Sequence, residues 1–442
     1  MSSFPYFPHT EEDLKQMLEK AGLDSMDGLY ADVPEEFIFK GEFSVPSAMS
    51  EMEVLEYFRQ LECMNSRLSV FCGAGAYDHY SPSVIPYIIS RSEFQTAYTP
   101  YQAEISQGTL RYIFEFQSMI CSLTGMDCAN ASMYDGPTSA AEAMMMSVAA
   151  ARKKKRILLS RALLPQVLET VKTYASYNGM LVSEVSCDGG VTSMESLKET
   201  LASGDVAGVL VPGINRYGII EDLTGFADTV HSAGALLAVY SDPSVLAVIK
   251  TPGEWEADIA CGDAQTLGMP LSFGGPYAGF LACRKSLVRK LPGRIVGATT
   301  DKEGKRCFVL TLQAREQHIR REKATSNICS NQSLMALWAT VYMSLMGNEG
   351  LEKVNDLSYS GAHYLYDKLI ATEGFTPVFD KPFLKEFVLK PICSAEDLHK
   401  GLTEAGYFAA LPTEEGYVSF CVTEKHKKDE VDRLVGIIRT LI

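Results

Sequence analysis

Residues 236–242, Leu-Leu-Ala-Val-Tyr-Ser-Asp, decide the fold class. They form a short uncharged run of strand length that ends in an acid. Similar runs lie upstream, each about one helix of sequence from the next, at residues 157–160, 181–185 and 206–211. This alternation is typical of βαβ units and a mostly parallel sheet. We therefore expect an α/β protein that binds ligands at the carboxyl edge of its sheet, where Asp242 lies.

The length of the chain predicts more than one domain. At 442 residues, 46% of them hydrophobic, the chain can bury a large core and exceeds one ordinary domain. The order of apolar and helical stretches predicts a helical N-terminal segment at 1–60, a large sheet domain at 61–330 and a small C-terminal α/β domain at 331–442.

Charge and cysteine content limit the classes of partner. The chain has 40 Lys and Arg against 55 Asp and Glu, a net charge of −15, which argues against a general affinity for nucleic acid or an anionic membrane. Residues 1–18 lack the pattern of a signal peptide, and no apolar run reaches transmembrane length. Eleven cysteines without a Cys-x-x-Cys pair indicate free thiols in a reducing compartment. We expect a cytoplasmic protein without a metal site.

A second site signal lies at Asp135-Gly136-Pro137-Thr138-Ser139, just before an Ala- and Met-rich stretch of strong helix propensity. Its backbone N–H groups, with the hydroxyls of Thr138 and Ser139, could cradle an anion. The alternative is an ordinary N-capped helix, and Asp242 could equally be a cap or turn residue. Together the two signals resemble the large domain of fold type I pyridoxal phosphate (PLP) transferases, where a helix N-terminus holds the phosphate and an aspartate pairs with the pyridine nitrogen.

An enzyme of that type needs a lysine for its Schiff base, about one short helix and one strand beyond the aspartate. The corresponding segment is 257–268, and no lysine lies between Lys250 and Lys285. Gln265 stands near the expected position. The cofactor pocket is therefore predicted to be degenerate in this chain and to hold no PLP; its remnants are Asp135, Gly136, Thr138, Asp242 and Gln265.

Longer strings make the resemblance more specific. FQTAYTPYQAEISQG at 94–108, GDAQ at 262–265 with FGGPYAGF at 273–280, and QAREQHIRREKATSNIC at 313–329 closely resemble glycine decarboxylase P-proteins of the glycine cleavage system. The YFPHT element at 6–10 adds to them, so the similarity spans most of the chain. One departure is Leu164-Pro165, where family members often have His-Pro. That leucine cannot stack and hydrogen-bond as an imidazole would.

The resemblance implies a function that two chains share. In the family the enzyme has two homologous halves, fused or separate, and only the C-terminal half carries the PLP lysine. The chain then resembles the separate N-terminal subunit, an oxidoreductase component that is inactive alone and assembles as two copies of each chain. With its PLP-bearing partner, subunit 2, it would decarboxylate glycine and pass the aminomethyl group to the lipoyl arm of the H-protein.

The same strings supply the candidate site residues, which the resemblance assigns to the partner's active site. They are Tyr98, Tyr101 and Glu104 from the first string and Thr325, Ser326 and Asn327 from the third. The alternative for all six is a packing role at the interface. Basic residues of the third string would meet acidic or phosphate groups across that interface, or else form a solvated helix face: Arg315, Arg320, Arg321 and Lys323.

Two other functions stay open. The chain could be a free-standing PLP-dependent aminotransferase or decarboxylase that uses Lys250 or Lys285. It could also be a scaffold that kept an enzyme fold without its chemistry. A neighbouring gene for a homologue with a lysine at the position of Gln265 would favour the subunit.

Overall fold

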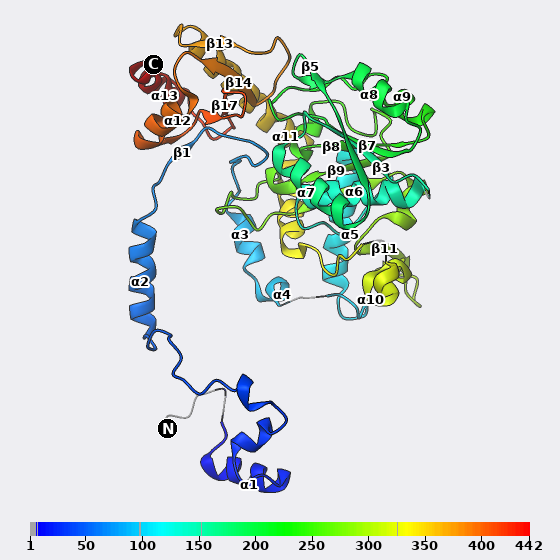
Figure 1. Cartoon of the computed structure of the whole chain (residues 1–442), viewed down its shortest axis with the longest axis vertical. Helices are drawn as coiled ribbons and strands as arrows, with labels where there is room; N and C mark the ends of the chain where they lie inside the picture. Colours follow the sequence, from blue (N-terminus) through cyan, green and yellow to red (C-terminus); the bar gives the residue numbers. More distant parts are fainter. Residues whose placement is uncertain (1–5, 7, 97–98, 152, 325) are drawn as a thin grey trace. The chain divides into compact units, whose positions relative to one another are not determined.

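The computed structural model describes the chain except for residues 1–5, 7, 97–98, 152 and 325. It divides into two units, Met1–Ser66 and Arg67–Ile442 (Figure 1). The first unit contains helices α1 (Glu11–Ala21) and α2 (Glu51–Cys63), with two short 3-10 helices, η1 (Met26–Tyr30) and η2 (Glu35–Phe37), between them.

A seven-stranded sheet organises the second unit. Its strand order is β2-β10-β9-β8-β7-β3-β4, and the five strands from β9 to β4 run parallel, whereas β10 is antiparallel to both of its neighbours. The strands are β2 (Cys128–Ala129), β3 (Arg156–Ser160), β4 (Leu181–Val185), β7 (Val206–Pro212), β8 (Leu236–Tyr240), β9 (Ile259–Asp263) and β10 (Gly279–Cys283). The expected α/β fold with a mostly parallel sheet is confirmed.

Helices cover both faces of this sheet because its strands are apolar on both sides. In β8, Leu237 and Val239 enter one core with Phe116, whereas Ala238 and Tyr240 enter the other with Met144. The helices and the 3-10 helix around the sheet are α5 (Gln107–Thr124), α6 (Gly136–Ala151), α7 (Pro165–Tyr177), α8 (Met194–Leu201), α9 (Phe226–Ser232) and η3 (Pro243–Ala247). Parallel strands with helices between them direct their carboxyl ends, and the residues that follow, to one edge.

A third core lies in the C-terminal part of the chain. A four-stranded antiparallel sheet of order β13-β14-β17-β16 packs against two amphipathic helices around Phe420 and Leu434. Its elements are β13 (Phe375–Pro377), β14 (Glu386–Pro391), α12 (Ala395–Glu404), β16 (Leu411–Pro412), β17 (Val418–Cys421) and α13 (Lys428–Leu441). Beside it, β1 (Ser69–Val70) pairs in parallel with β15 (Tyr407–Phe408), so a segment early in the chain joins the C-terminal core.

The long helix α11 (Ser333–Ile370) serves two cores. Tyr342 packs in the core of the large sheet, whereas Leu365 packs in the C-terminal core, and the non-helical Gly347 interrupts the helix between them. The boundary proposed after residue 330 thus falls just before a helix that both cores share.

The remaining elements are small. They are α3 (Val84–Ile89), α4 (Ser92–Gln95), the ribbon β5 (Cys187–Asp188) with β6 (Val191–Thr192), the hairpin β11 (Ile295–Thr300) with β12 (Arg306–Thr311), α10 (Gln317–Arg320), and the 3-10 helices η4 (Ala264–Thr266), η5 (Lys285–Lys290), η6 (Gln313–Arg315) and η7 (Arg321–Lys323). Among the residues that the structure describes, no helix is both long and apolar enough to cross a membrane.

Candidate functional site

Asp242 lies at the carboxyl edge of the large sheet, two residues after the end of β8. Its Oδ1 caps η3 by accepting from the Ser244 backbone N–H at 2.9 Å, and it also accepts from the Thr266 hydroxyl at 2.6 Å. The residue is therefore the cap that the sequence offered as one alternative, and it lies at the carboxyl edge of the sheet. Its other oxygen, Oδ2, faces the C-terminal core.

That second oxygen is paired with a lysine that the sequence analysis did not single out. Lys385, just before β14, places its Nζ 2.6 Å from Asp242 Oδ2, and its side chain is only 3% exposed. The same ammonium lies 4.1 Å from the ring centroid of Tyr77. Burial alone would raise the pKa of Asp242, but the charge and hydrogen bond of Lys385 hold it below its usual value. The carboxylate thus has an internal counter-ion.

The buried lysine is also hydrogen-bonded to a histidine. Lys385 Nζ lies 3.0 Å from His79 Nε2, and His79 Nδ1 lies 2.7 Å from Glu424 Oε2. Burial, then the nearby Lys385 charge, lower the pKa of His79 although Glu424 opposes them, so the ring is neutral at pH 7. Since the ammonium can only donate, Nε2 accepts and Nδ1–H donates to Glu424. A continuous network of polar contacts therefore runs from Asp242 through Lys385 and His79 to Glu424. It ties the C-terminal core to the large sheet.

Gln265, at the expected Schiff-base position, is fully buried and fully hydrogen-bonded. Its Oε1 accepts from the Tyr77 backbone N–H at 2.8 Å. Its Nε2 donates to the carbonyl oxygens of Tyr77, at 2.8 Å, and Met269, at 2.7 Å. An amide can both accept and donate in this way, whereas a lysine ammonium only donates. Gln265 therefore holds the loop around Tyr77 against the sheet.

Carboxylates occupy the N-terminus of α6, where the resemblance places a phosphate. Asp135 Oδ1 accepts from the Thr138 backbone N–H at 2.7 Å, and Asp263 Oδ2 accepts from the Gly136 N–H at 2.8 Å. Pro137 has no N–H to offer. Burial raises the pKa of Asp263 to about 7, against the two backbone hydrogen bonds that it accepts. The segment is thus an internally capped helix, and an added phosphate would meet acids in place of free donors.

Little room remains beside these groups. The cavity between Tyr77, Leu164, Asp242 and Lys385 has a free volume of about 30 Å³, enough for about two water molecules and not for a pyridine ring with its phosphate. A larger space of about 390 Å³ lies between Asp135 and Tyr277, but neither Asp242 nor Gln265 lines it. The residues of this chain therefore do not fit PLP, because the acid, the phosphate donors and the Schiff-base position all have internal partners.

The structure brings the first and third strings together around Arg294. The Tyr101 ring lies 5.7 Å from the Arg294 guanidinium and 6.0 Å from the His318 ring. Arg294 also donates to the carbonyl oxygen of Cys329 at 2.9 Å. Of the candidate residues, Tyr101, Glu104 and Asn327 are exposed, while Tyr98 and Thr325 lie outside the described residues.

Ser326, the remaining candidate, points inward and not to the surface. Its hydroxyl donates to Glu142 Oε1 on α6 at 2.7 Å. Glu142 is 1% exposed, and its Oε2 has no hydrogen-bond partner among the described residues. Burial raises the pKa of this carboxyl to about 7 although the Ser326 hydroxyl lowers it. The third string is therefore anchored to α6 at Ser326, with Asn327 beside it at the surface.

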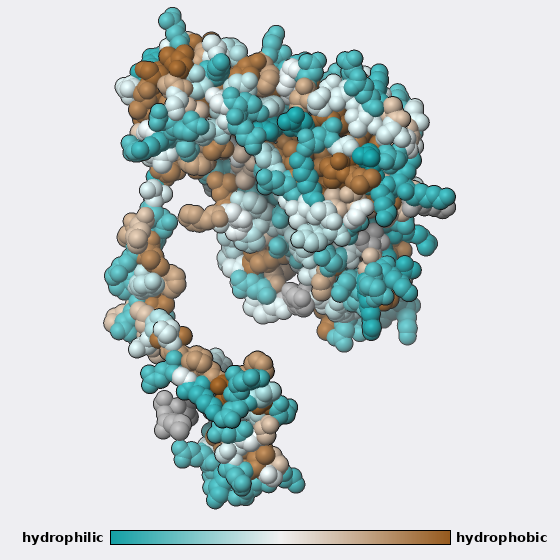
Figure 2. Space-filling view, viewed as in Figure 1, coloured by the Kyte–Doolittle hydropathy of each residue, from teal (hydrophilic) through white to brown (hydrophobic). Residues whose placement is uncertain are grey.

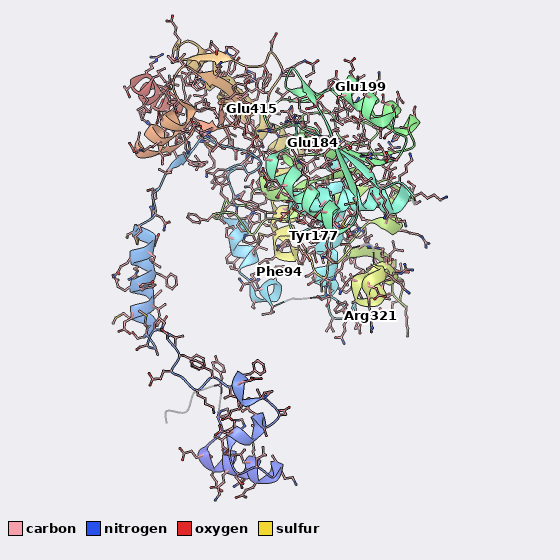
Figure 3. All side chains as sticks on the ribbon, viewed as in Figure 1. Phe94, Tyr177, Glu184, Glu199, Arg321 and Glu415 are labelled. Atoms are coloured by element: carbon pink, nitrogen blue, oxygen red, sulfur yellow. The ribbon has the colours of Figure 1, made fainter. Side chains whose placement is uncertain are left out.

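The basic residues of the third string divide into two groups. Arg315 turns inward and donates to the carbonyl oxygens of Leu291 and, at 2.6 Å, Gly293. Arg320, Arg321 and Lys323 are exposed. Figure 3 labels Arg321, which lies on the short helices of this segment. Of the four cations, only these three are available to a second chain.

Comparison with known proteins identifies the family. The model of the glycine cleavage system P-protein family matches residues 5–438. The chain belongs to this family.

Relatives of the P-protein family match over their whole length. Proteins named "Probable glycine dehydrogenase (decarboxylating) subunit 1" from Moorella thermoacetica and Shouchella clausii are 48% and 46% identical, with 99% and 100% of both chains covered. A crystal structure described as glycine decarboxylase (P-protein) of the glycine cleavage system, in inhibitor-bound form, superimposes with a TM-score of 0.93 at 39% identity, covering 99% of this chain and 100% of that one. The expectation of a separate N-terminal P-protein subunit, and with it an enzyme subunit of the oxidoreductase class, is confirmed.

More distant structures support the fold alone. A sphingosine-1-phosphate lyase from Burkholderia pseudomallei has a TM-score of 0.68 at 14% identity and covers 93% of this chain. The predicted fold type I transferase architecture is thereby confirmed. Within that architecture this P-protein chain has Gln265 near the expected lysine position, and its Lys385 forms an ion pair with Asp242.

Proposed function

We propose that the chain is the subunit of a glycine decarboxylase that holds no PLP and works only with a homologous PLP-bearing subunit 2. The observation that carries this proposal is the ion pair between Lys385 and Asp242, which leaves the acid without a role toward a pyridine nitrogen. It is supported by the carboxylates that accept from the backbone N–H groups of Gly136 and Thr138, and by the hydrogen bonds of Gln265.

The reaction proposed for the assembled enzyme is PLP-dependent decarboxylation of glycine, with transfer of the aminomethyl group to the lipoyl arm of the H-protein. Support comes from the family and from the subunit 1 name of its full-length relatives. All eleven cysteines are free thiols, which fits the reducing cytoplasm in which we place the enzyme.

We further propose that this chain contributes side chains to the wall of the partner's active site. The candidates are those of the two strings that meet at Arg294, where Tyr101, Glu104 and Asn327 are exposed on the described surface and Ser326 anchors the third string. Tyr98 and Thr325 belong to the same proposal. Exposed aromatic, carboxylate and amide groups of this kind can orient a small zwitterion or the end of a lipoyl arm.

The free-standing PLP enzyme is not favoured. Lys250 is exposed and lies with its Nζ 3.7 Å from the centroid of the Trp255 ring, and Lys285 is exposed at the start of η5. Neither lines the cavity beside Asp242. A scaffold without chemistry remains the second candidate, and activity of the assembled enzyme separates the two.

The test is reconstitution. The chain and a homologue with a lysine at the position of Gln265 are purified separately and together. Exchange of labelled bicarbonate into the glycine carboxyl group is then followed with lipoylated H-protein. We expect exchange only from the mixture, and a borohydride-fixed pyridoxyl group only on the homologue. Exchange by the homologue alone at the rate of the mixture would favour the scaffold, and a stoichiometric pyridoxyl group on Lys250 or Lys285 would favour the free-standing enzyme.

A further inference from the structure

The N-terminal unit forms its helices from local signals. At α1, Thr10 and Asp13 make a reciprocal capping box, and at α2, Ser50 and Glu53 make another. Such boxes satisfy free backbone N–H groups at a helix start without any tertiary contact. The helices are thus specified locally, whatever covers their sides.

The described residues of this unit leave those sides largely exposed. None of its described residues is buried, and 20 of the 36 exposed large hydrophobic residues of the described chain lie between Tyr6 and Met64. Figure 2 shows hydrophobic patches along this unit. On α2, spacing of three and four residues places Val54, Phe58 and Leu61 on one face, with Leu55 beside them. Short isolated helices are marginal in water, so an apolar face of this kind indicates a covering surface.

The charge of the unit restricts what that surface can be. Residues 1–66 contain 14 acidic and 4 basic residues, a net charge of −10 out of −15 for the chain. Residues 67–442 therefore carry −5. Docking the acidic unit on its own body or on a second copy of this chain would bring together two surfaces with the same sign of net charge. A different chain, with apolar surface rimmed by Lys and Arg, is the better occupant.

We propose that residues 8–66 are a docking arm that folds onto the PLP-bearing subunit 2, with the apolar face of α2 as its anchor. This inference rests on the proposed function, because it takes its occupant from the subunit pair. The arm buries its aromatic and aliphatic side chains in an apolar groove, and its acidic residues meet basic groups at the rim. The ordering of the arm is coupled to assembly.

A matched pair of variants in the full-length chain tests the anchor. Phe58→Ser with Leu61→Ser removes two side chains from the apolar face of α2. Gln60→Ser with Cys63→Ser puts the same residue at two exposed, uncharged positions on the opposite face. Affinity for the purified PLP-bearing homologue is measured by calorimetry, and hydrogen exchange of residues 51–63 is followed with and without that homologue.

We expect the apolar-face variant to weaken binding at least about tenfold and the control to stay within about twofold. Exchange in residues 51–63 of the parent chain should slow only in the complex. Equal affinity of both variants, with the parent bound and its exchange in the arm unchanged, overturns the arm but leaves the subunit pair standing. Absence of binding by the parent overturns the proposed function itself.

Two further outcomes identify other occupants. If the apolar-face variant lowers the thermal stability of the lone chain, the arm covers its own body. If it abolishes self-association of the lone chain, the arm covers a second copy. Either result overturns the proposal.

Discussion

Lys385 Nζ and Asp242 Oδ2 lie 2.6 Å apart, although the two residues are 143 positions apart in the sequence. The pair joins the first turn after a strand of the large sheet to the start of β14, an inner strand of the C-terminal sheet. An aspartate at this place pairs with a cofactor ring in the enzymes that the fold resembles. Here the chain supplies the positive charge itself.

Removing that charge should destabilise the protein strongly. Lys385→Met leaves the Asp242 carboxylate buried without a counter-ion, a loss of about 3–5 kcal/mol in the free energy of unfolding at pH 7. Urea unfolding measures it. The double variant Lys385→Met with Asp242→Asn keeps the cap of η3 and removes the unpaired charge, so it should recover more than half of the loss. Equal stability of the single variant and the parent would show that the pair is not important for the fold.

Acid should weaken the same pair. Because the pKa of Asp242 is lower in the folded chain than its usual value, its contribution to stability is complete above about pH 4 and is lost as the pH falls through the folded value. The double variant should lack this part of the acid sensitivity. Parallel unfolding curves of parent and double variant between pH 5 and pH 3 would contradict the assignment.

Restoring the lysine should not restore a cofactor site. Gln265→Lys supplies an amine, but Asp242 remains paired with Lys385 and the N-terminus of α6 remains capped by Asp135 and Asp263. We expect no pyridoxyl group at position 265 after incubation with PLP, borohydride reduction and peptide mapping. The PLP-bearing homologue treated in parallel is the positive control, and a stoichiometric adduct on residue 265 would disprove the prediction.

A rise in pH from about 5 to 8 should weaken the packing of the third string against α6. The folded pKa of Glu142 is raised from 4.5 to about 7, so the folded state binds the proton more tightly and stability falls as the pH rises from about 5 to 8. The expected loss is about 2–3 kcal/mol. Glu142→Gln should remove this part of the slope, whereas Glu199→Gln, at the exposed position on α8 labelled in Figure 3, should not. Urea unfolding at both pH values measures the difference, and identical slopes would refute a buried neutral Glu142.

Candidate residues of the first and third strings should matter for catalysis and not for assembly. Asn327→Ala, or Tyr98→Phe, should lower bicarbonate exchange of the reconstituted enzyme by about tenfold, or about 1.4 kcal/mol of barrier. Asn348→Ala removes another exposed amide, from α11, and is the control. Sedimentation and PLP content should stay at parental values. Parental exchange rates for both site variants would assign these residues to interface packing.

The sequence predicted the large sheet because its strands are uncharged runs at regular spacing, and it placed Asp242 and the Asp135 turn at the ends of elements. It did not reveal what those residues contact. Lys385 stands next to Glu386 at the start of a buried strand, and a charged pair at such a place was the available signal. The partner of Lys385 depends on how two cores pack, which spacing along the chain does not encode. His79 and Glu424 were missed for the same reason.

The shared helix α11 has a consequence for how the body unfolds. Unfolding of the C-terminal core would expose the apolar side chains in the second half of the helix. Unfolding of the large core would expose those in the first half. Since each core packs on one half of α11, we expect the body from Arg67 onward to unfold as one cooperative unit. A protease that cuts between architectural domains would find the single non-helical residue Gly347 between two helical halves of α11, where other proteins offer a linker.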